Sequence, residues 1–219
     1  MAKIWISPAN IFPSLLAADA MRLGKEIAEL KTLGITTVHL DIMDNHYVPN
    51  LSFGPHIAKH IKTHFPELHL DVHLMATPVD TLIESFATAG ANRISIHPDA
   101  TTDLDKSLDS IRSLGCEAGL VLNPTTSSTC LTWCAHHLSF VLLMTVNPGF
   151  GGQKLIPDVI PKIKQLAKDY PTLDIAVDGG IDTSNIQRLA EAGAKTFIIG
   201  SALFNTHDYR TTLNNLCGL

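Results

Sequence analysis

The sequence predicts an α/β fold, a single (β/α)8 or TIM barrel that takes up residues 1–219 as one domain. Short runs rich in Val, Ile and Leu alternate with stretches of helical periodicity, and this order is typical of helices packed around a parallel sheet. Eight such pairs in 219 residues favour a closed barrel, which needs about 200 to 250 residues. Several helical stretches end in glycine, as helices commonly do.

The predicted strands are four to seven residues long, as expected for strands that are buried on both faces. In chain order they are Ile11–Leu16, Thr37–Ile42, His69–Leu74, Arg93–His97, Glu117–Leu122, Phe140–Val146, Asp174–Asp178 and Thr196–Gly200.

The predicted helices lie between the strands, and four of them end at Gly34, Gly90, Gly115 and Gly193. The clearest are Asp19–Leu33, Pro55–Phe65, Val79–Ala89, Leu104–Leu114, Leu155–Tyr170 and Asn185–Ala192. No Gly-x-Gly-x-x-Gly motif follows the first strand, so the sequence does not predict a dinucleotide site.

Composition limits the classes of partner. Hydrophobic residues make up 45% of the chain and charged residues 17%, which is enough for a large core. The net charge is −5 and no basic block stands out, so nucleic acid is not an expected partner. Apolar runs such as Phe140–Met144 are too short to cross a bilayer. The stretch Ile4–Pro8 is too brief for a secretory signal, so a cytoplasmic location is expected.

Two groups of metal-binding residue types are interpreted as structural. Cys130 and Cys134 stand four apart, but no second ligand pair follows at zinc-site spacing, so they are expected to be buried thiols without disulfides. His56, His60 and His64 recur every four residues on one predicted helix, where no carboxylate completes a site. We expect them to form a solvated face.

A more specific pattern stands at the ends of three predicted strands, where a barrel of this type places its active site. Side chains alternate along a strand, so His39 and Asp41 share one face, as do Asp71 and His73. Asp178 ends a later strand. Together, His39, Asp41, His73 and Asp178 are expected to converge, with no interior Lys or Arg seen beside them.

Two imidazoles and two carboxylates suit one divalent metal ion. Zn²⁺ is favoured, with Fe²⁺, Mn²⁺ or Co²⁺ as alternatives. Satisfied interior polar residues are the competing interpretation for each residue alone, but the convergence of four from three strands disfavours it.

Glycine-rich loops follow the last three strands. They are Asn147–Gln153, Asp178–Gly180 and Gly200-Ser201. Glycine lets backbone N–H groups approach an anion closely, and barrels commonly bind phosphate with the loops after strands seven and eight. The sequence therefore predicts a phosphate site, and Gly149–Gln153 is expected to act as a lid.

These stretches resemble the ribulose-phosphate 3-epimerase family, nearly throughout the chain. The order and combination of the motifs are far more specific than any one of them. The similar segments are Pro13–Asp19, His39–Asp44 with Val48–Asn50, Asp71–Met75, His97-Pro98, Met144–Gln153, Val177–Gly180 and Gly200-Ser201.

The resemblance implies a metal-dependent isomerase of the pentose phosphate pathway that interconverts D-ribulose 5-phosphate and D-xylulose 5-phosphate. It implies that His39, Asp41, His73 and Asp178 bind the metal and that Asp41 and Asp178 are also the catalytic acid/base pair. The implied substrate-binding residues are Ser14, His73, Gly149, Phe150, Gly151, Gly152, Asp178, Gly179, Gly180, Gly200 and Ser201.

The implied reaction suits these residue types. Epimerisation next to a carbonyl removes a proton from one face of the carbon and returns one to the other, which two carboxyl groups can do. A metal ion stabilises the enediolate intermediate. Met43, Met75 and Met144 are expected to form either an apolar wall beside this planar intermediate or ordinary core packing.

The chain departs from the family pattern at two positions. Asn45 stands where the family usually has glycine, and asparagine tolerates the left-handed backbone better than other residues. Ala20 stands where a large apolar residue is common, which could loosen local packing. Neither residue is an expected ligand.

A barrel of this kind allows three alternative functions. Related decarboxylases and hexulose-phosphate synthases use Asp-x-Lys-x-x-Asp, whereas here Met43 and His46 occupy the Lys and last Asp positions. A 3-epimerase of a hexulose 6-phosphate such as D-allulose 6-phosphate would use the same four ligands. A non-catalytic sugar-phosphate sensor is disfavoured, because both acid/base residues are present.

A homo-oligomer is expected, with dimer and hexamer both left open.

Overall fold

A computed structural model describes residues 4–219, so residues 1–3 of the predicted domain lie outside it. The eight strands agree with the predicted ones to within a few residues. They are β1 Ile11–Pro13, β2 Thr37–Met43, β3 His69–Met75, β4 Arg93–Ile96, β5 Glu117–Leu122, β6 Phe140–Met144, β7 Asp174–Asp178 and β8 Thr196–Ile199. The chain leaves β1 earlier than predicted, because Leu15–Ala17 turn into a short 3-10 helix.

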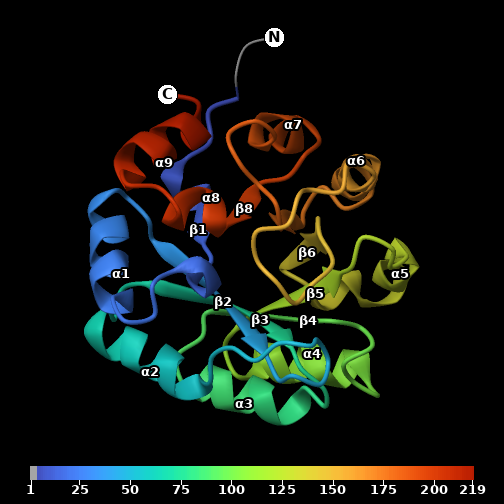
Figure 1. The fold of residues 1–219 in the computed structure, drawn as a ribbon. Coiled ribbons are helices and arrows are strands. Elements are labelled where there is room, and N and C mark those ends of the chain that lie inside the picture. The colour runs from blue at the N-terminus through green and yellow to red at the C-terminus, as the bar shows by residue number, and fades with distance from the viewer. Residues whose placement is uncertain (1–3) are drawn as a thin grey trace.

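All strands are parallel and belong to one sheet with the order β1-β8-β7-β6-β5-β4-β3-β2. Its two end strands meet through a parallel bridge between Ser14 and His39. The sheet therefore closes on itself, with helices around it (Figure 1). The predicted (β/α)8 barrel is confirmed.

The helices surround the sheet on its outer face. Their bounds are α1 Leu23–Thr32, α2 Pro55–His64, α3 Asp80–Thr88, α4 Leu104–Ser113, α5 Leu131–Cys134, α6 Val159–Asp169, α7 Ile186–Glu191, α8 Ser201–Phe204 and α9 Tyr209–Cys217. The predicted stop glycines Gly34, Gly90, Gly115 and Gly193 all have positive φ angles, as residues that end a helix commonly do. The predicted ranges do not include α5, α8 or α9. The longest of these is α9, which begins after the capping residue Asp208 and ends before Gly218.

Two helices begin later than predicted, for local reasons. The Asp19 carboxylate accepts a hydrogen bond from the Met21 N–H, which forms a turn before α1. Before α6, the Ile156 N–H donates to the Thr145 carbonyl at 2.8 Å, and Pro157 follows. A residue before proline is disfavoured in helical conformation, so the helix begins only at Val159.

Apolar side chains fill two layers. The larger layer lies between the sheet and the helices and includes Leu40, Val72 and Ile94, all fully buried. The smaller layer includes Phe140, Leu142 and Ile198 and fills the inside of the barrel. The interior is therefore packed, and an open site is expected only beyond the strand ends.

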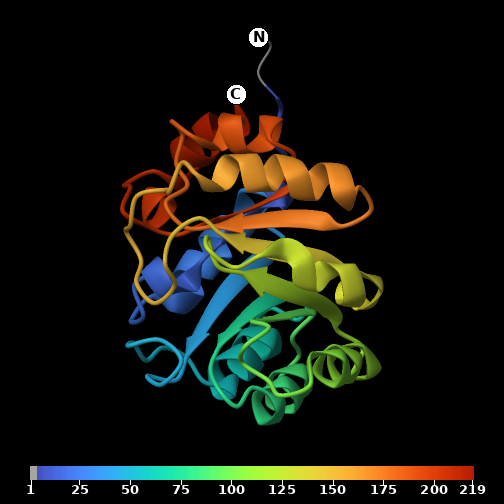
Figure 2. The ribbon, with the colours of Figure 1, turned by 90° about the vertical axis from the view of Figure 1, so that its right-hand side faces the viewer.

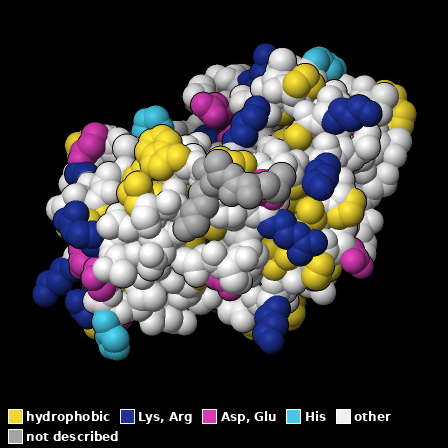
Figure 3. Space-filling view, turned by 90° about the horizontal axis from the view of Figure 1, so that it is seen from above, with side chains coloured by type: hydrophobic (Ala, Val, Ile, Leu, Met, Phe, Trp, Pro, Cys, Tyr) yellow, Lys and Arg dark blue, Asp and Glu magenta, His cyan; other side chains and the backbone are white. Residues whose placement is uncertain are grey.

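Figure 2 shows that the loops after β2 and β6 lie on the same side of the molecule, where the strand arrows end. On the face seen in Figure 3, the Lys and Arg side chains are scattered among hydrophobic and uncharged ones. None of the helices in residues 4–219 combines the length and apolar character needed for a bilayer crossing.

Candidate active site

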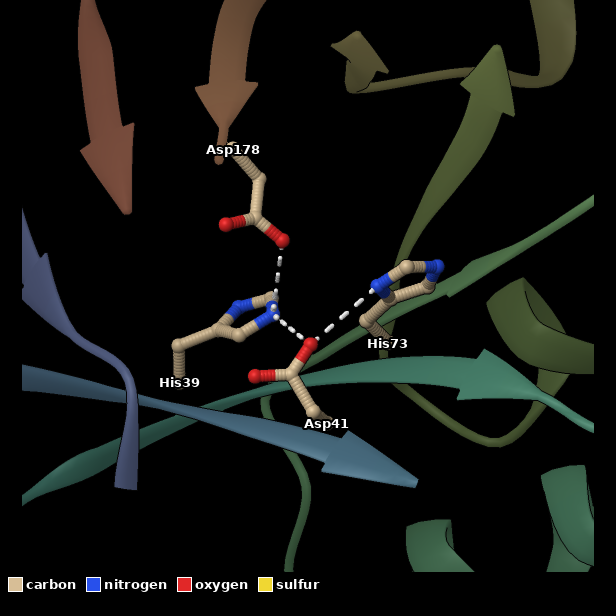
Figure 4. A group of neighbouring side chains, drawn as sticks. All are labelled: His39, Asp41, His73 and Asp178. Carbon is tan, nitrogen blue, oxygen red and sulfur yellow. Dashed lines mark ion pairs between the residues drawn. The ribbon is translucent and has the colours of Figure 1, made fainter. Parts of the chain in front are cut away.

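Strand alternation brings the four predicted ligands together. His39 and Asp41 come from β2, His73 from β3 and Asp178 from β7, and all four point toward one another (Figure 4). Each offers a ligand atom, and these atoms all lie within 4.8 Å of one another. The His39 Nε2 atom lies 3.4 Å from Asp41 Oδ1 and 3.9 Å from Asp178 Oδ2, and His73 Nδ1 lies 3.6 Å from Asp41 Oδ1.

The donor set fits a divalent metal ion. His39 Nε2 and His73 Nδ1 are buried and have no hydrogen-bond partner among the residues described. Buried polar atoms are normally satisfied, so two bare imidazole nitrogens facing two carboxylates mark a place for a cation. Within residues 4–219 this is the one group of His, Cys, Asp and Glu side chains close enough to hold a metal.

The remaining ring nitrogen of each histidine is occupied. His39 Nδ1 lies 2.8 Å from Asp71 Oδ2, and His73 Nε2 lies 2.9 Å from His97 Nε2. Each ring is therefore held with a single nitrogen free to face the site, as is usual for metal-binding histidines. Asp71 and His97 were not among the predicted site residues, although Asp71 shares a face of β3 with His73 and His97 directly follows β4.

The expectation that no interior Lys or Arg lies near these carboxylates was wrong in part. Arg93, at the start of β4, extends into the barrel, and its guanidinium carbon lies 3.9 Å from the centroid of the Phe140 ring. Its Nε lies 3.3 Å from Asp71 Oδ1 and its Nη2 lies 3.2 Å from Asp174 Oδ2. Arg93 compensates the negative charge of Asp71 and forms no ion pair with Asp41 or Asp178.

The two candidate acid/base residues are held by neighbouring polar groups. The Ser14 hydroxyl donates to Asp41 Oδ2 at 2.6 Å, which leaves Asp41 Oδ1 toward the histidines. The backbone of Asp178 is fixed at the end of β7, because the Thr145 N–H donates to the Asp178 carbonyl at 2.7 Å and the Thr145 hydroxyl donates to it at 2.9 Å.

The two carboxyl groups differ in proton affinity. Burial raises the pKa of Asp178, and the nearby Asp41 carboxylate raises it further, to about 8. Burial also raises the pKa of Asp41, but His39 and His73 outweigh it and hold the pKa of that carboxyl well below its usual range. Burial lowers the pKa of His39, yet Asp41 and Asp71 outweigh it and raise that pKa. The two carboxyl groups therefore differ in proton affinity, and Asp178 is the one that is protonated more readily.

A cavity of about 270 Å³ opens above this cluster. Most of the predicted substrate-binding residues line it: Ser14, Gly149, Phe150, Gly151, Gly152, Asp178, Gly179, Gly180, Gly200 and Ser201. Asp41 also lines the cavity. His39 and His73 are fully buried and are not among its lining residues. The predicted contact of His73 with substrate therefore stays a prediction.

Glycine is required at two of these lining positions. Gly179 and Gly180 have φ angles of 115° and 64°, in the left-handed region that other residues rarely adopt. A Cβ atom on Gly180 would lie 2.3 Å from the backbone nitrogen of Leu155, and one on Gly179 would lie 2.3 Å from Val146 Cγ2. The loops after β6 and β7 therefore pack against each other closely at the cavity wall.

Met43, Met75 and Met144 all line the cavity. Met43 and Met75 pack with Val48 in a small apolar cluster, whereas Met144 belongs to the barrel interior. They form an apolar side to the cavity and also contribute to packing, so neither of the two expected roles is excluded.

The other predicted features lie away from the cavity. His56, His60 and His64 are exposed on α2, in agreement with the solvated face. All four cysteines are free; Cys116, Cys134 and Cys217 are buried, and Cys130 is partly exposed. Asn45 has a φ angle of 58°, so it adopts the left-handed conformation expected of it.

Comparison with known proteins identifies close relatives. A sequence profile described as the ribulose-phosphate 3 epimerase family matches residues 10–204. The ribulose-phosphate 3-epimerase of Escherichia coli is 43% identical, and the match covers 94% of this chain and 93% of the relative. Ribulose-phosphate 3-epimerase 1 of Cupriavidus necator is 47% identical, and the match covers 91% of this chain and 86% of the relative.

Solved structures with much lower sequence identity share the fold. A mutant tryptophan synthase alpha-subunit from Pyrococcus furiosus matches with a TM-score of 0.73 and 15% identity, covering 99% of this chain and 100% of that one. A thiamine phosphate pyrophosphorylase from the same organism matches with a TM-score of 0.62 and 13% identity, covering 95% and 94%. These likenesses support the barrel architecture alone.

Proposed function

The chain belongs to the ribulose-phosphate 3-epimerase family, and we propose that it interconverts D-ribulose 5-phosphate and D-xylulose 5-phosphate by two-base proton transfer at C3. It is thus an isomerase of the pentose phosphate pathway. The observation that carries the mechanism is the cluster of Asp41, Asp178 and two imidazoles beneath a cavity lined by glycine-rich loops.

The two carboxyl groups approach the cavity from different strands. Asp41 lies near the end of β2, and Asp178 is the last residue of β7. A substrate whose C3 lies between them would lose its proton to one carboxylate and receive a proton on the opposite face from the other carboxyl group. The Ser14 hydroxyl, which donates to Asp41 Oδ2, would hold that carboxylate in position while the enediolate exists.

The same cluster would hold the metal ion. His39 and His73 would bind it through their bare nitrogens, and Asp41 and Asp178 through carboxylate oxygens. Zn²⁺ is favoured, and Fe²⁺, Mn²⁺ and Co²⁺ are compatible with the same donors. When bound, the ion supplies a Lewis acid that stabilises negative charge developing on the substrate oxygens.

The phosphorylated end of the substrate would lie against the glycine-rich loops. Backbone N–H groups of Gly149–Gly152, Gly179, Gly180, Gly200 and Ser201 can approach a phosphate without obstruction from large side chains. Phe150 lines the same cavity. Together the loops would fix the sugar phosphate so that C3 reaches the carboxyl groups.

The test compares turnover of D-ribulose 5-phosphate and D-allulose 6-phosphate on one sample, with metal analysis of that sample. The proposal predicts faster turnover of the pentulose phosphate and about one bound metal ion per chain. Faster turnover of the hexulose phosphate would favour the hexulose epimerase instead. Binding of pentulose phosphate without any exchange of the C3 hydrogen in deuterated water would indicate a sensor. Assembly into a homo-oligomer and a cytoplasmic location stay predictions.

A further inference from the structure

The segment Val48–Asn50 has no role in the proposed chemistry, yet it reaches the mouth of the cavity. It belongs to the loop after β2, and Asn50 lines the same cavity as Asp41 and Asp178. Asn50 Nδ2 donates a hydrogen bond of 2.7 Å to the carbonyl oxygen of Gly149, 99 residues along the chain. We refer to this hydrogen bond as the mouth contact.

The mouth contact joins loops from opposite sides of the barrel. In the closed ring, β2 and β6 are separated by β1, β8 and β7 on one side and by β3, β4 and β5 on the other. Their two loops lie on the same side of the molecule, at the ends of the strands (Figure 2). The contact therefore joins, from opposite sides of the barrel, two of the loops that line the cavity above Asp41 and Asp178.

Interactions within its own loop hold Asn50 in place independently of the mouth contact. Its carbonyl oxygen accepts a bond of 2.8 Å from the Asn45 N–H, and an antiparallel bridge between Asp44 and Leu51 closes the same turn. The Asn50 Oδ1 atom accepts a bond of 2.9 Å from the Leu51 N–H. Because the amide oxygen is occupied in this way, the amide NH₂ group must face Gly149.

The opposite loop is also held by an amide. Gln153 Nε2 donates to the carbonyl oxygens of Asn147 at 2.7 Å and Phe150 at 2.8 Å. Gln153 and Asn50 together donate hydrogen bonds to three backbone carbonyl oxygens of the loop that carries Gly149–Gly152. A carbonyl oxygen that faced a phosphate would repel it. Amide donors that engage these carbonyl oxygens therefore favour a loop conformation that can bind an anion.

We infer that Asn50 is a positioning residue that holds the Gly149–Gln153 loop across the cavity mouth in its substrate-binding conformation. This inference rests on the proposed function, because it assumes that the loop binds the phosphorylated end of the substrate. Asn50 acts through Gly149 and not on the reacting atoms. Its loss should therefore weaken binding of the sugar phosphate and leave the proton transfer itself almost unchanged.

The main experiment measures kcat and KM for D-ribulose 5-phosphate with wild type, Asn50→Ala and Leu51→Ala. Leu51 is the matched control, because its exposed side chain lies in the same loop and does not form the mouth contact. We expect Asn50→Ala to raise KM about tenfold, the effect of one lost hydrogen bond, with kcat within about threefold of wild type. Inorganic phosphate, used as a competitive inhibitor, should bind about tenfold more weakly. Leu51→Ala should match wild type.

Chymotrypsin provides a second readout, because Phe150 is 57% exposed within the loop. Cleavage after Phe150 should be faster in Asn50→Ala than in wild type or Leu51→Ala, since the loop opens more often. Gln153→Ala removes the second amide donor to the loop and should give the same rise in KM. This variant keeps the test decisive if Asn50→Ala does not fold.

The outcomes separate this inference from the proposed function. Wild-type protein that neither turns over the pentulose phosphate nor binds inorganic phosphate would overturn the proposed function. Active wild type together with unchanged KM, phosphate affinity and Phe150 cleavage in folded Asn50→Ala would overturn the role of Asn50. A fall in kcat without any change in KM would also overturn it, because Asn50 would then act on the chemical step.

Discussion

Asp71 Oδ2 lies 2.8 Å from Nδ1 of His39, and both groups are buried in the barrel. The carboxylate accepts a hydrogen bond from Nδ1–H, so the ring presents Nε2 to the cluster. On its other side Asp71 is neutralised by Arg93. Asp71 is therefore a third buried carboxylate near the site, and its interactions direct it toward His39 and away from a metal ion.

This relationship predicts that Asp71→Asn weakens metal binding. The amide removes the negative charge that orients His39 and makes it a stronger ligand, so affinity for Zn²⁺ should fall about 10- to 100-fold. The measurement is competition with a chromophoric chelator, starting from metal-free protein. Asp174→Asn removes a different partner of Arg93 and should change the affinity by no more than about twofold. Equal affinities in wild type and Asp71→Asn would contradict this role.

Removal of the metal should abolish turnover. After exhaustive chelation and dialysis the protein should be inactive, and addition of Zn²⁺, Mn²⁺ or Co²⁺ should restore activity. The retained fold is checked by circular dichroism of the metal-free sample. Full activity in a sample shown by elemental analysis to be metal-free would refute the role of the metal.

Asp44 should make stability depend on pH. Burial alone would raise its pKa, but hydrogen bonds from the backbone N–H groups of Thr77, Tyr47 and His46 lower it. A carboxyl group with a lowered pKa stabilises the fold above its unfolded pKa of about 4, and this stabilisation is lost as the pH falls through the folded pKa.

The Asp44→Asn variant tests the sign of this pH dependence of stability. Its free energy of unfolding should be lower than that of wild type by about 1 kcal/mol at pH 7. The difference should shrink as the pH falls below about 4, where wild-type Asp44 also loses its charge. Urea unfolding at several pH values measures it, and a difference that stays constant from pH 7 to pH 3 would be the contrary result.

A side chain at Gly180 should destabilise the fold. A Cβ atom there would meet the backbone nitrogen of Leu155 at 2.3 Å, at a φ angle of 64°. Gly180→Ala should therefore lower the free energy of unfolding by about 2–3 kcal/mol. Gly151→Ala is the matched control, because a Cβ atom at Gly151 meets nothing within 4 Å. Equal losses in the two variants would show that the close packing of the loops is not the cause.

Strand periodicity explains why the cluster could be predicted. In a parallel barrel, the alternation of side chains determines which residues face inward, so His39, Asp41 and His73 could be placed without coordinates. Asp178 followed from its position at the end of a strand. The fold followed from the same regular patterns, with errors mainly at element ends such as β1 and α6.

The contacts around the cluster could not be predicted in the same way. The direction of Arg93 depends on the space beside Phe140 and on the position of Asp71, which no local pattern specifies. The mouth contact depends on the backbone path of two loops 99 residues apart. Such contacts depend on turns and packing, whereas periodicity describes only the regular elements.

The most direct test of the two-base account is epimerisation in deuterated water by wild type and by Asp178→Asn. Wild type should place deuterium at C3 of the product as it forms, because the returned proton comes from a carboxyl group that exchanges with solvent. Asp178→Asn should keep its fold, as judged by circular dichroism, and should lose at least about 100-fold in epimerisation rate. Near-normal turnover in that variant, or wild-type product formed without deuterium at C3, would contradict the account.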